Sequence, residues 1–152
     1  MLGVFAIPVI FQIGKLLFNE TFGLVTALFL AVSGFHIQYS QEARAYSLYF
    51  LLMSVSTFFS VLIYQKRTKY ASVGYVLSTA LLLYSHNTAL FSVAAVMVCY
   101  LILARPWRAS KIYPLLVTNV VAVLLYAPYI PVWASQAIKV GKQGLLDKRA
   151  NL

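Results

Sequence analysis

The sequence predicts an all-α integral membrane protein, a polytopic transmembrane bundle of about six helical spans. Apolar residues make up 62% of the chain and charged residues only 10%, whereas a soluble domain carries about 25% charged residues. The apolar residues form long blocks without the alternation of a β-strand, and the mean hydropathy is +0.83. The net charge of +9 comes from basic residues between these blocks, which indicates membrane lipids rather than nucleic acid as the partner.

The first half of the chain contains three apolar runs. Leu2–Phe18 and Phe22–Ile37 are separated by the polar turn Asn19–Thr21. Tyr46–Tyr64 is the cleanest run, because only Ser and Thr interrupt its apolar character, and the basic loop Gln65–Lys69 follows it. Each run is therefore a predicted transmembrane helix.

The second half of the chain continues the pattern. The stretch Tyr70–Leu103 is too long for one span, and the polar turn Ser85–Thr88 divides it into two predicted helices. A second basic loop, Arg105–Lys111, precedes the last run, Ile112–Tyr126. This run ends at the proline-containing corner Ala127–Pro131, because proline lacks the amide donor that a continuing helix needs.

The basic residues predict which end of the bundle faces the cytoplasm. Seven of them lie on one side of the alternating helices, against Arg44 alone in the opposite loops. By the positive-inside rule the first side is cytoplasmic, which predicts a multi-pass protein of the plasma (inner) membrane. We expect residues 1–136 to form the transmembrane core and residues 137–152 a basic extracytoplasmic tail. The seven residues are Lys15, Lys66, Arg67, Lys69, Arg105, Arg108 and Lys111.

Two of the predicted helices are short. The second and fourth runs offer about 16 residues each, or roughly 24 Å, whereas a span needs about 20 residues. Both end on the outer side, at His36 and at His86. We expect a recess there, walled by the longer neighbouring helices. The alternative is a locally thinned bilayer, or spans that polar residues extend.

A polar segment, Tyr39–Leu48, interrupts the apolar sequence on the predicted outer side. It contains Arg44 and Glu42, which is one of only three acidic residues in the chain. In a helix that begins near Ser40, this serine would be the cap and Glu42 would be favourable, whereas Arg44 would oppose the helix dipole. An arginine beside free backbone N–H groups is suited to binding an anion. The alternative is an interfacial loop whose charges only solvate a turn.

Histidines and glycines add two further expectations. His36 and His86 are either interfacial residues hydrogen-bonded to backbone or water, or residues that contact a substrate or handle protons. No cluster of His, Cys and carboxylates supports a metal site, and we predict neither a metal nor a cofactor. Glycines that fit close helix packing are Gly14, Gly23, Gly34 and Gly74.

Segments with a distinctive order lie along the chain: Gly3–Phe18, Phe35–Leu48, Leu83–Asn87 and Leu125–Pro131. The second reads Phe-His-Ile-Gln-Tyr-Ser-Gln-Glu-Ala-Arg-Ala-Tyr-Ser-Leu. It resembles the signature of GT-C membrane glycosyltransferases, in the bacterial branch similar to glycosyltransferase family 39 and the protein O-mannosyltransferases. The other segments resemble the helix before this signature, the tyrosine–histidine turn after it, and a later outer corner. The resemblance covers the chain to about Gln136.

The resemblance implies sugar transfer at the extracytoplasmic face. In such enzymes a polyprenyl-phosphate carrier donates the sugar, and an acceptor hydroxyl attacks the anomeric carbon with inversion. Arg44 would hold the carrier phosphate, and Glu42 would orient Arg44 or bind sugar hydroxyls. Weaker candidates for contacts with the donor are Tyr39, Gln41, Tyr46 and His86.

The catalytic base of the resembled enzymes is a carboxylate in the first outer loop, and this chain has no recognisable counterpart. No aspartate precedes Asp147, and Glu20 lies on the predicted cytoplasmic side. We therefore leave the catalytic residue unassigned. We expect a fragment that lacks the upstream first span and first outer loop and is inactive by itself. The sugar and the acceptor are not determined by the sequence.

Functions of other classes stay open. A transporter or flippase subunit would also contain a buried charge pair and glycines, but it predicts inverted repeats and charges at mid-bilayer depth. In this sequence Glu42 and Arg44 lie at the boundary of a span, and no repeat is visible. A non-catalytic membrane scaffold predicts instead that Glu42→Gln and Arg44→Ala leave every activity unchanged.

Overall fold

The computed structural model describes residues 2–41, 46–66, 68–86, 88–103, 109–131 and 135. Over these residues the chain forms seven α-helices, two short 3₁₀ helices and no β-strand. This arrangement confirms the all-α prediction. The elements in order are η1 (Leu2–Phe5), α1 (Ala6–Leu17), α2 (Glu20–Val32), α3 (Gly34–Gln41), α4 (Tyr46–Lys66), α5 (Lys69–Ser85), α6 (Ala89–Leu103), α7 (Ala109–Tyr126) and η2 (Ala127–Tyr129).

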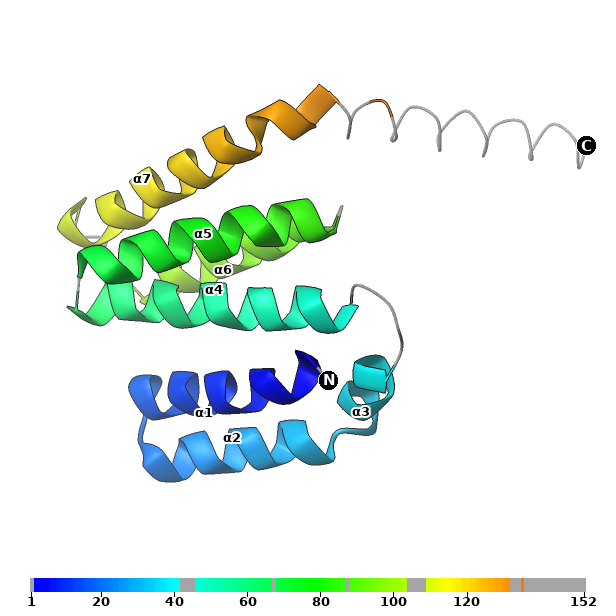
Figure 1. Cartoon of the computed structure of the whole chain (residues 1–152). Helices are drawn as coiled ribbons and strands as arrows, with labels where there is room; N and C mark the ends of the chain where they lie inside the picture. The colour runs from blue at the N-terminus through cyan, green and yellow to red at the C-terminus, as the bar shows by residue number, and fades with distance from the viewer. Residues whose placement is uncertain are drawn as a thin grey trace, which may run out of the picture.

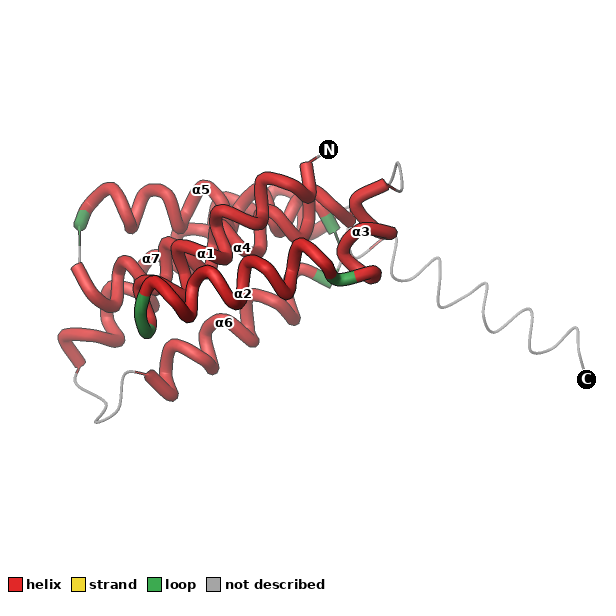
Figure 2. The backbone as a smooth tube through the Cα atoms, turned by 90° about the horizontal axis from the view of Figure 1, so that it is seen from below, coloured by secondary structure: helices red, strands yellow, loops and turns green. Residues whose placement is uncertain are grey.

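The longer helices run alongside one another and alternate in direction (Figure 1). The end of α1, the start of α2, the end of α4 and the start of α5 meet at one end of the bundle, which we call the Lys15 end. The N-terminus, the start of α4 and the end of α5 lie at the opposite end, together with α3. The short α3 lies across that end rather than along the bundle (Figure 2), and we call it the α3 end.

Helix α4 is the central element, because it contacts η1, α1, α3, α5, α6 and α7. Between α4 and α5 the hydroxyls of Ser56 and Thr79 share a buried hydrogen bond of 2.8 Å. Among the described residues, every buried side-chain nitrogen or oxygen has a hydrogen-bond partner, as an apolar interior requires. The buried core residues are Ile63, Ala71, Tyr75, Val96, Tyr100 and Leu115 toward the Lys15 end, and Leu82, Leu83, Ala89 and Tyr126 toward the α3 end.

Asn119 on α7 links the three helices of the second half. Its side-chain oxygen accepts a 3.1 Å hydrogen bond from the hydroxyl of Tyr75 on α5. Its side-chain nitrogen donates to the Leu115 carbonyl at 2.9 Å and lies 3.5 Å from the sulfur of Met97 on α6. Because the Tyr75 side chain is completely buried, the bond to Asn119 satisfies a hydroxyl that has no access to solvent.

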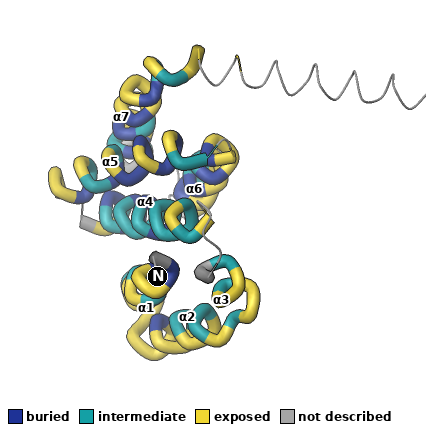
Figure 3. Tube along the Cα trace, turned by 45° about the vertical axis from the view of Figure 1, so that its right-hand side comes forward, coloured by how far each residue is buried: buried dark blue, intermediate teal, exposed yellow. Residues whose placement is uncertain are grey.

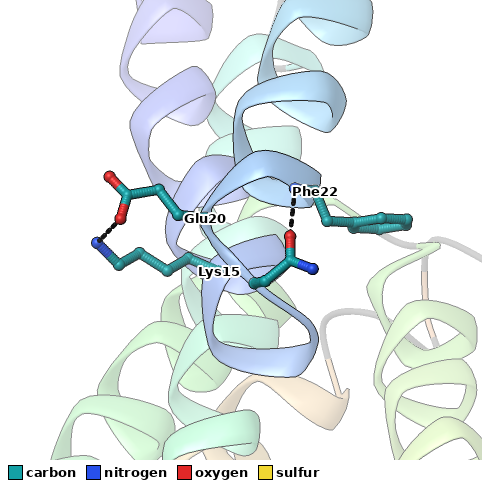
Figure 4. A network of polar contacts seen from close by, with 4 residues as sticks. Lys15, Glu20 and Phe22 are labelled. Carbon is teal, nitrogen blue, oxygen red and sulfur yellow. Dashed lines mark hydrogen bonds and ion pairs between the residues drawn. The ribbon is translucent and has the colours of Figure 1, made fainter.

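The α1–α2 hairpin is closed by glycines and by polar contacts at its turn. A Cβ atom added at Gly14 would lie 2.8 Å from the Cα atom of Gly23, so only glycine permits this helix approach. At the turn, the Asn19 side chain caps α2 by accepting a 2.8 Å hydrogen bond from the Phe22 amide. Lys15 and Glu20 form an exposed ion pair of 3.2 Å beside it (Figure 4).

Replacing Gly23 with alanine should destabilise the protein by about 2 kcal/mol. The new Cβ atom would lie 2.6 Å from the backbone oxygen of Phe11, so the helices must separate. Thermal unfolding of the reconstituted protein, followed by circular dichroism, measures the effect. Gly34→Ala is the matched control, because open space surrounds its Cβ position. Equal melting temperatures for the two variants would contradict the prediction.

The expectation of close packing at glycines is thus confirmed at three positions and wrong at the fourth. Gly14 and Gly23 pack against each other, and a Cβ atom at Gly74 would lie 2.5 Å from the ring of Phe59. At Gly34, by contrast, no atom lies within 4 Å of the Cβ position. Gly34 begins α3, and its Cβ position faces open space.

The predicted second run, Phe22–Ile37, is not one helix. Helix α2 ends at Val32, Ser33 is extended, and α3 follows. The Ser33 hydroxyl accepts a 3.4 Å hydrogen bond from the His36 amide, so this serine caps α3. The expected cap at Ser40 is also wrong, because Ser40 lies in the last turn of α3 and α4 begins only at Tyr46.

Helix length identifies fewer spans than the apolar runs predicted. Within the described ranges, Tyr46–Gln65 and Ile112–Tyr129 are long and apolar enough to cross a membrane. Shorter apolar helices occupy Gly3–Leu17, Glu20–Val32 and Ala89–Ile102. A count of about six spans is therefore not established by helix length alone.

The helices expected to be short are short. Helix α2 has 13 residues and α5 has 17, which correspond to about 20 Å and 26 Å of helix. Both lengths fall below the roughly 30 Å of a hydrocarbon core. The outward-facing surface of the bundle is nevertheless apolar: the side chains of Phe29 on α2 and Leu124 on α7 are 71% and 65% exposed. Exposed positions recur along α1, α2 and α7 (Figure 3). Such faces are typical of contact with lipid.

Candidate functional site

The predicted site residues fall into two groups. Tyr39, Tyr46 and His86 have described side chains, and all of them lie at the α3 end. Gln41 is the last residue of α3, but its side chain lies outside the described part. Glu42 and Arg44 lie outside the described residues altogether. The candidate site is therefore built from the aromatic residues on either side of the charged pair.

A cavity of about 340 Å³ lies at the α3 end, between the end of α2, the inner face of α3 and the first turns of α4. Its volume falls within the range of small-molecule sites. The crosswise orientation of α3 forms one wall of this cavity, so the break at Ser33 is what creates it. The lining residues are Leu30, Phe35, His36, Tyr39, Tyr46, Ser47, Tyr49 and Phe50.

Aromatic rings line most of this cavity and touch one another across helices. Tyr39 at the end of α3 meets Tyr46 at the start of α4 edge to face, with 5.5 Å between ring centroids. Phe35 packs on Tyr39 at 4.7 Å, and His36 packs on Phe50 at 5.3 Å. Tyr39 and Tyr46 lie on either side of Glu42 and Arg44 in the sequence, and their contact brings these two flanking positions together. One edge-to-face pair and two tilted pairs favour a defined wall over mobile side chains.

His36 connects this wall to the start of the chain. One ring nitrogen, Nε2, lies 3.2 Å from the carbonyl oxygen of Gly3 in η1. The ring is half-buried, and it lines the cavity beside Phe50. As expected, His36 and His86 lie at the same end of the bundle. His36 is bonded to backbone, which is the first of the two roles that the sequence left open.

His86 immediately follows the last residue of α5, and its ring contacts two tyrosines that line the cavity. Its ring centroid lies 5.7 Å from that of Tyr46 and 5.5 Å from that of Tyr49. Its Nδ1 atom lies 2.8 Å from the hydroxyl of Thr88 and accepts a 3.2 Å hydrogen bond from the Thr88 amide. The Tyr49 hydroxyl in turn shares a hydrogen bond with the hydroxyl of Ser92 on α6.

Sequence reasoning missed several residues of the wall, among them Tyr49 and Phe50. Their signal was present in the spacing, because Tyr49 and Phe50 follow Tyr46 by three and four positions and therefore share its face of the helix. The same stripe continues along α4 through Met53, Thr57 and others. The signal was hidden, since every position of this apolar run is compatible with lipid contact.

A second cavity of about 300 Å³ lies farther along the same stripe of α4, between α1 and α6. It is lined mainly by apolar side chains, with Thr57, Ser60 and Tyr64 as the hydroxyl-bearing residues of α4. Tyr46, Phe50, Met53, Thr57 and Ser60 repeat at helical spacing, so the two cavities follow one face of α4. The lining residues are Leu17, Met53, Thr57, Ser60, Val61, Tyr64, Ala95, Val96, Cys99 and Tyr100.

Another group of tyrosines lies at the α3 end, apart from the aromatic cavity under α3. Tyr84 on α5 packs on Tyr126 and Tyr129 with centroid distances of 5.4 Å each. The Tyr84 hydroxyl donates a 3.0 Å hydrogen bond to the Leu125 carbonyl. These rings cover one another and line neither cavity, an arrangement typical of interfacial tyrosines.

Charged and metal-binding groups are sparse in the described part of the chain. Glu20 is the one carboxylate side chain there, and it lies at the Lys15 end in an ion pair with Lys15. Across those same ranges no group of three or more His, Cys, Asp or Glu side chains comes together. The described wall can therefore stack on a ligand and donate hydrogen bonds, but it contains no carboxylate that could take up a proton.

Comparison with known proteins identifies one family. The family model described as dolichyl-phosphate-mannose-protein mannosyltransferase matches residues 1–133, which is most of the chain. No curated protein and no solved structure gives a match. The matched range includes both cavities, the crosswise α3 and the polar segment Tyr39–Leu48.

Proposed function

This chain belongs to the dolichyl-phosphate-mannose-protein mannosyltransferase family, and from that premise we propose that its α3 end forms part of a sugar-transfer site. Members of the family are membrane proteins, and the family indicates a glycosyltransferase with a lipid-linked donor. The proposed reaction moves a sugar from a polyprenyl-phosphate carrier to an acceptor hydroxyl at the extracytoplasmic face of the plasma membrane. The multi-pass topology and the orientation are parts of the same proposal.

The observation that carries the proposal is the aromatic cavity under α3. It combines the faces of several aromatic rings with a few hydroxyl groups, including Ser47, Tyr39 and Tyr46. A sugar ring presents C–H groups on its faces and hydroxyls on its edges, so it suits such a wall. The best small-molecule sites likewise pair apolar surface with a few placed polar groups.

The polar segment Tyr39–Leu48 supplies the charged side chains that the aromatic wall lacks. Arg44 is two positions from Tyr46, and Glu42 is three positions from Tyr39. In the proposed site Arg44 binds the carrier phosphate, because a guanidinium matches phosphate geometry with paired hydrogen bonds. Glu42 orients Arg44 or binds sugar hydroxyls, and Gln41 is a further candidate for donor contact.

The proposed chemistry is an inverting displacement. The oxygen of the acceptor hydroxyl forms a bond to the anomeric carbon while the bond from that carbon to the phosphate oxygen breaks. A base takes up the hydroxyl proton, and the phosphate leaves with the bonding electron pair. Arg44 stabilises the negative charge that develops on the phosphate. The base stays unassigned, since Glu20 lies at the opposite end of the bundle.

The second cavity offers a path for the lipid tail of the donor. It follows the same face of α4 as the aromatic cavity and lies between α1 and α6. A carrier whose phosphate lies near the α3 end would direct its apolar chain along α4 into the membrane. The positions of Lys15 and Lys69 at the other end of the bundle support a cytoplasmic location for that end.

Replacing Tyr46 with leucine should lower kcat/KM for a polyprenyl-phosphate mannose about tenfold. The ring packs on Tyr39 and forms part of the cavity wall, and the loss of aromatic stacking accounts for about 1.4 kcal/mol. Release of radiolabelled mannose from the donor by the full chain in lipid nanodiscs measures it. Tyr70→Leu is the matched control, because Tyr70 is 88% exposed and lies at the start of α5.

Tyr46→Phe should retain most of the activity, since it keeps the ring. Equal losses in the Tyr46→Leu and Tyr70→Leu variants would exclude the α3 end as the donor site. Movement of the intact lipid-linked sugar across the bilayer without its release would favour the flippase alternative instead.

A further inference from the structure

The cavity wall at the α3 end rests on a second layer of side chains. His86 does not line the cavity. Its ring instead packs behind two residues that do, Tyr46 and Tyr49, at centroid distances of 5.7 and 5.5 Å. The imidazole thus reaches the cavity only through these tyrosines. This placement differs from the direct donor contact that the sequence suggested for His86.

Thr88 holds the imidazole in one orientation. Its amide donates a 3.2 Å hydrogen bond to Nδ1 of His86, and its hydroxyl lies 2.8 Å from the same atom. Because Nδ1 accepts the amide hydrogen, the neutral ring must carry its own proton at Nε2. Two contacts from one residue therefore fix both the tautomer and the plane of the ring.

Ser92 supports the second tyrosine from the same element. Its hydroxyl shares a hydrogen bond with the hydroxyl of Tyr49. Thr88 immediately precedes α6 and Ser92 lies in its first turn. The Ser92 amide donates to the Thr88 carbonyl at 3.4 Å, so these two residues, four positions apart, lie one above the other. The supports of Tyr46 and Tyr49 therefore both originate where α6 begins.

We propose that Thr88 is a positioning residue of the sugar-transfer site, acting through His86 on the tyrosines of the cavity wall. This proposal rests on the proposed function. Tyr46 begins α4 and is 37% exposed, so its ring would sample several rotamers without support. A wall that is already ordered spares the ligand the entropy of ordering it, and this strengthens binding.

The test uses two substitutions that differ in one group. Thr88→Val keeps the branched shape and the amide but removes the hydroxyl, whereas Thr88→Ser keeps the hydroxyl. We expect Thr88→Val to raise KM for a polyprenyl-phosphate mannose about fivefold, the effect of one lost hydrogen bond, with kcat changed less than twofold. Thr88→Ser should restore the original KM.

A second readout needs no turnover. The chain has two histidines, so ¹⁵N-histidine labelling gives resonances from two imidazole rings. The resonances that remain in the His36→Gln variant belong to His86. The Nδ1 resonance of His86 should be that of a hydrogen-bonded acceptor in the original protein. It should move toward the free value in Thr88→Val and return in Thr88→Ser.

The outcomes separate this proposal from the one on which it rests. An active protein whose Nδ1 resonance and KM are unchanged by Thr88→Val overturns the role of Thr88 and leaves the proposed function standing. An original protein that neither binds polyprenyl-phosphate mannose nor releases mannose overturns both. If Thr88→Val fails to fold, His86→Asn replaces it, because the amide oxygen retains an acceptor for Thr88 while the ring is lost. An unchanged KM in that variant likewise overturns the proposal.

Discussion

Replacing Arg44 with alanine should lower kcat/KM for a polyprenyl-phosphate sugar about a hundredfold. The departing phosphate gains negative charge as its bond to the sugar breaks, and the loss of one cationic donor at such a position typically costs a factor of 10² or more. In the sequence Arg44 is two positions before Tyr46, which lines the aromatic cavity. Sugar release by the full chain in nanodiscs measures turnover, and titration with polyprenyl phosphate measures affinity for the carrier.

The conservative change Arg44→Lys is the control for this effect. It keeps the charge but loses the paired hydrogen bonds of the guanidinium, so we expect an intermediate loss of about tenfold. Unchanged affinity for polyprenyl phosphate in Arg44→Ala would remove the phosphate role. If Glu42→Gln were silent as well, the non-catalytic scaffold would become the better explanation.

Replacing Tyr75 with alanine should destabilise the protein by about 3 kcal/mol, the largest structural effect that we expect from one side chain. The Tyr75 side chain is completely buried in the core shared by α4, α5, α6 and α7. Its removal leaves a cavity and takes away the hydroxyl that donates to Asn119. Chemical denaturation of the reconstituted protein, followed by tryptophan fluorescence, measures the change in free energy of unfolding.

Tyr75→Phe separates the two contributions. It keeps the ring and removes only the hydroxyl, so the loss should be about 1 kcal/mol. Equal losses for the alanine and phenylalanine variants would mean that packing of the ring contributes little. Leu81→Ala on α5 serves as a further control, because its side chain is 57% exposed on the outer surface.

The helical class could be predicted because long apolar blocks without alternation leave no other stable structure in a membrane. The approximate ends of most helices followed from polar turns, such as Asn19, which does cap α2. The break at Ser33 was missed, since the apolar residues Phe35 and Ile37 extend the run beyond it. The turn of α3 across the bundle combines a local contact, the Ser33 cap, with a tertiary one, the contact of His36 with Gly3, 33 positions away.

The candidate site could be predicted only as a location. Tyr39, Tyr46 and His86 do lie at one end of the bundle, since the alternation of helices places their segments together. The role of His86 could not be read, because it depends on contacts with Tyr49 and Thr88 made between helices. The same applies to Ser92, whose hydrogen bond to Tyr49 joins residues 43 positions apart.

Under the proposed multi-pass topology, the α1–α2 hairpin is suited to enter the bilayer as one unit during synthesis. With 13 residues, α2 is too short to be a stable insertion signal by itself. Once α1 is present, the Gly14–Gly23 approach offers α2 a partner made only of the residues just before it. The Lys15–Glu20 pair places opposite charges together at the turn. If this turn stays on the side of the membrane where the chain is made, neither charge has to cross the hydrocarbon. The α1–α2 hairpin, on which α3 later packs, would then be formed before α4 leaves the ribosome.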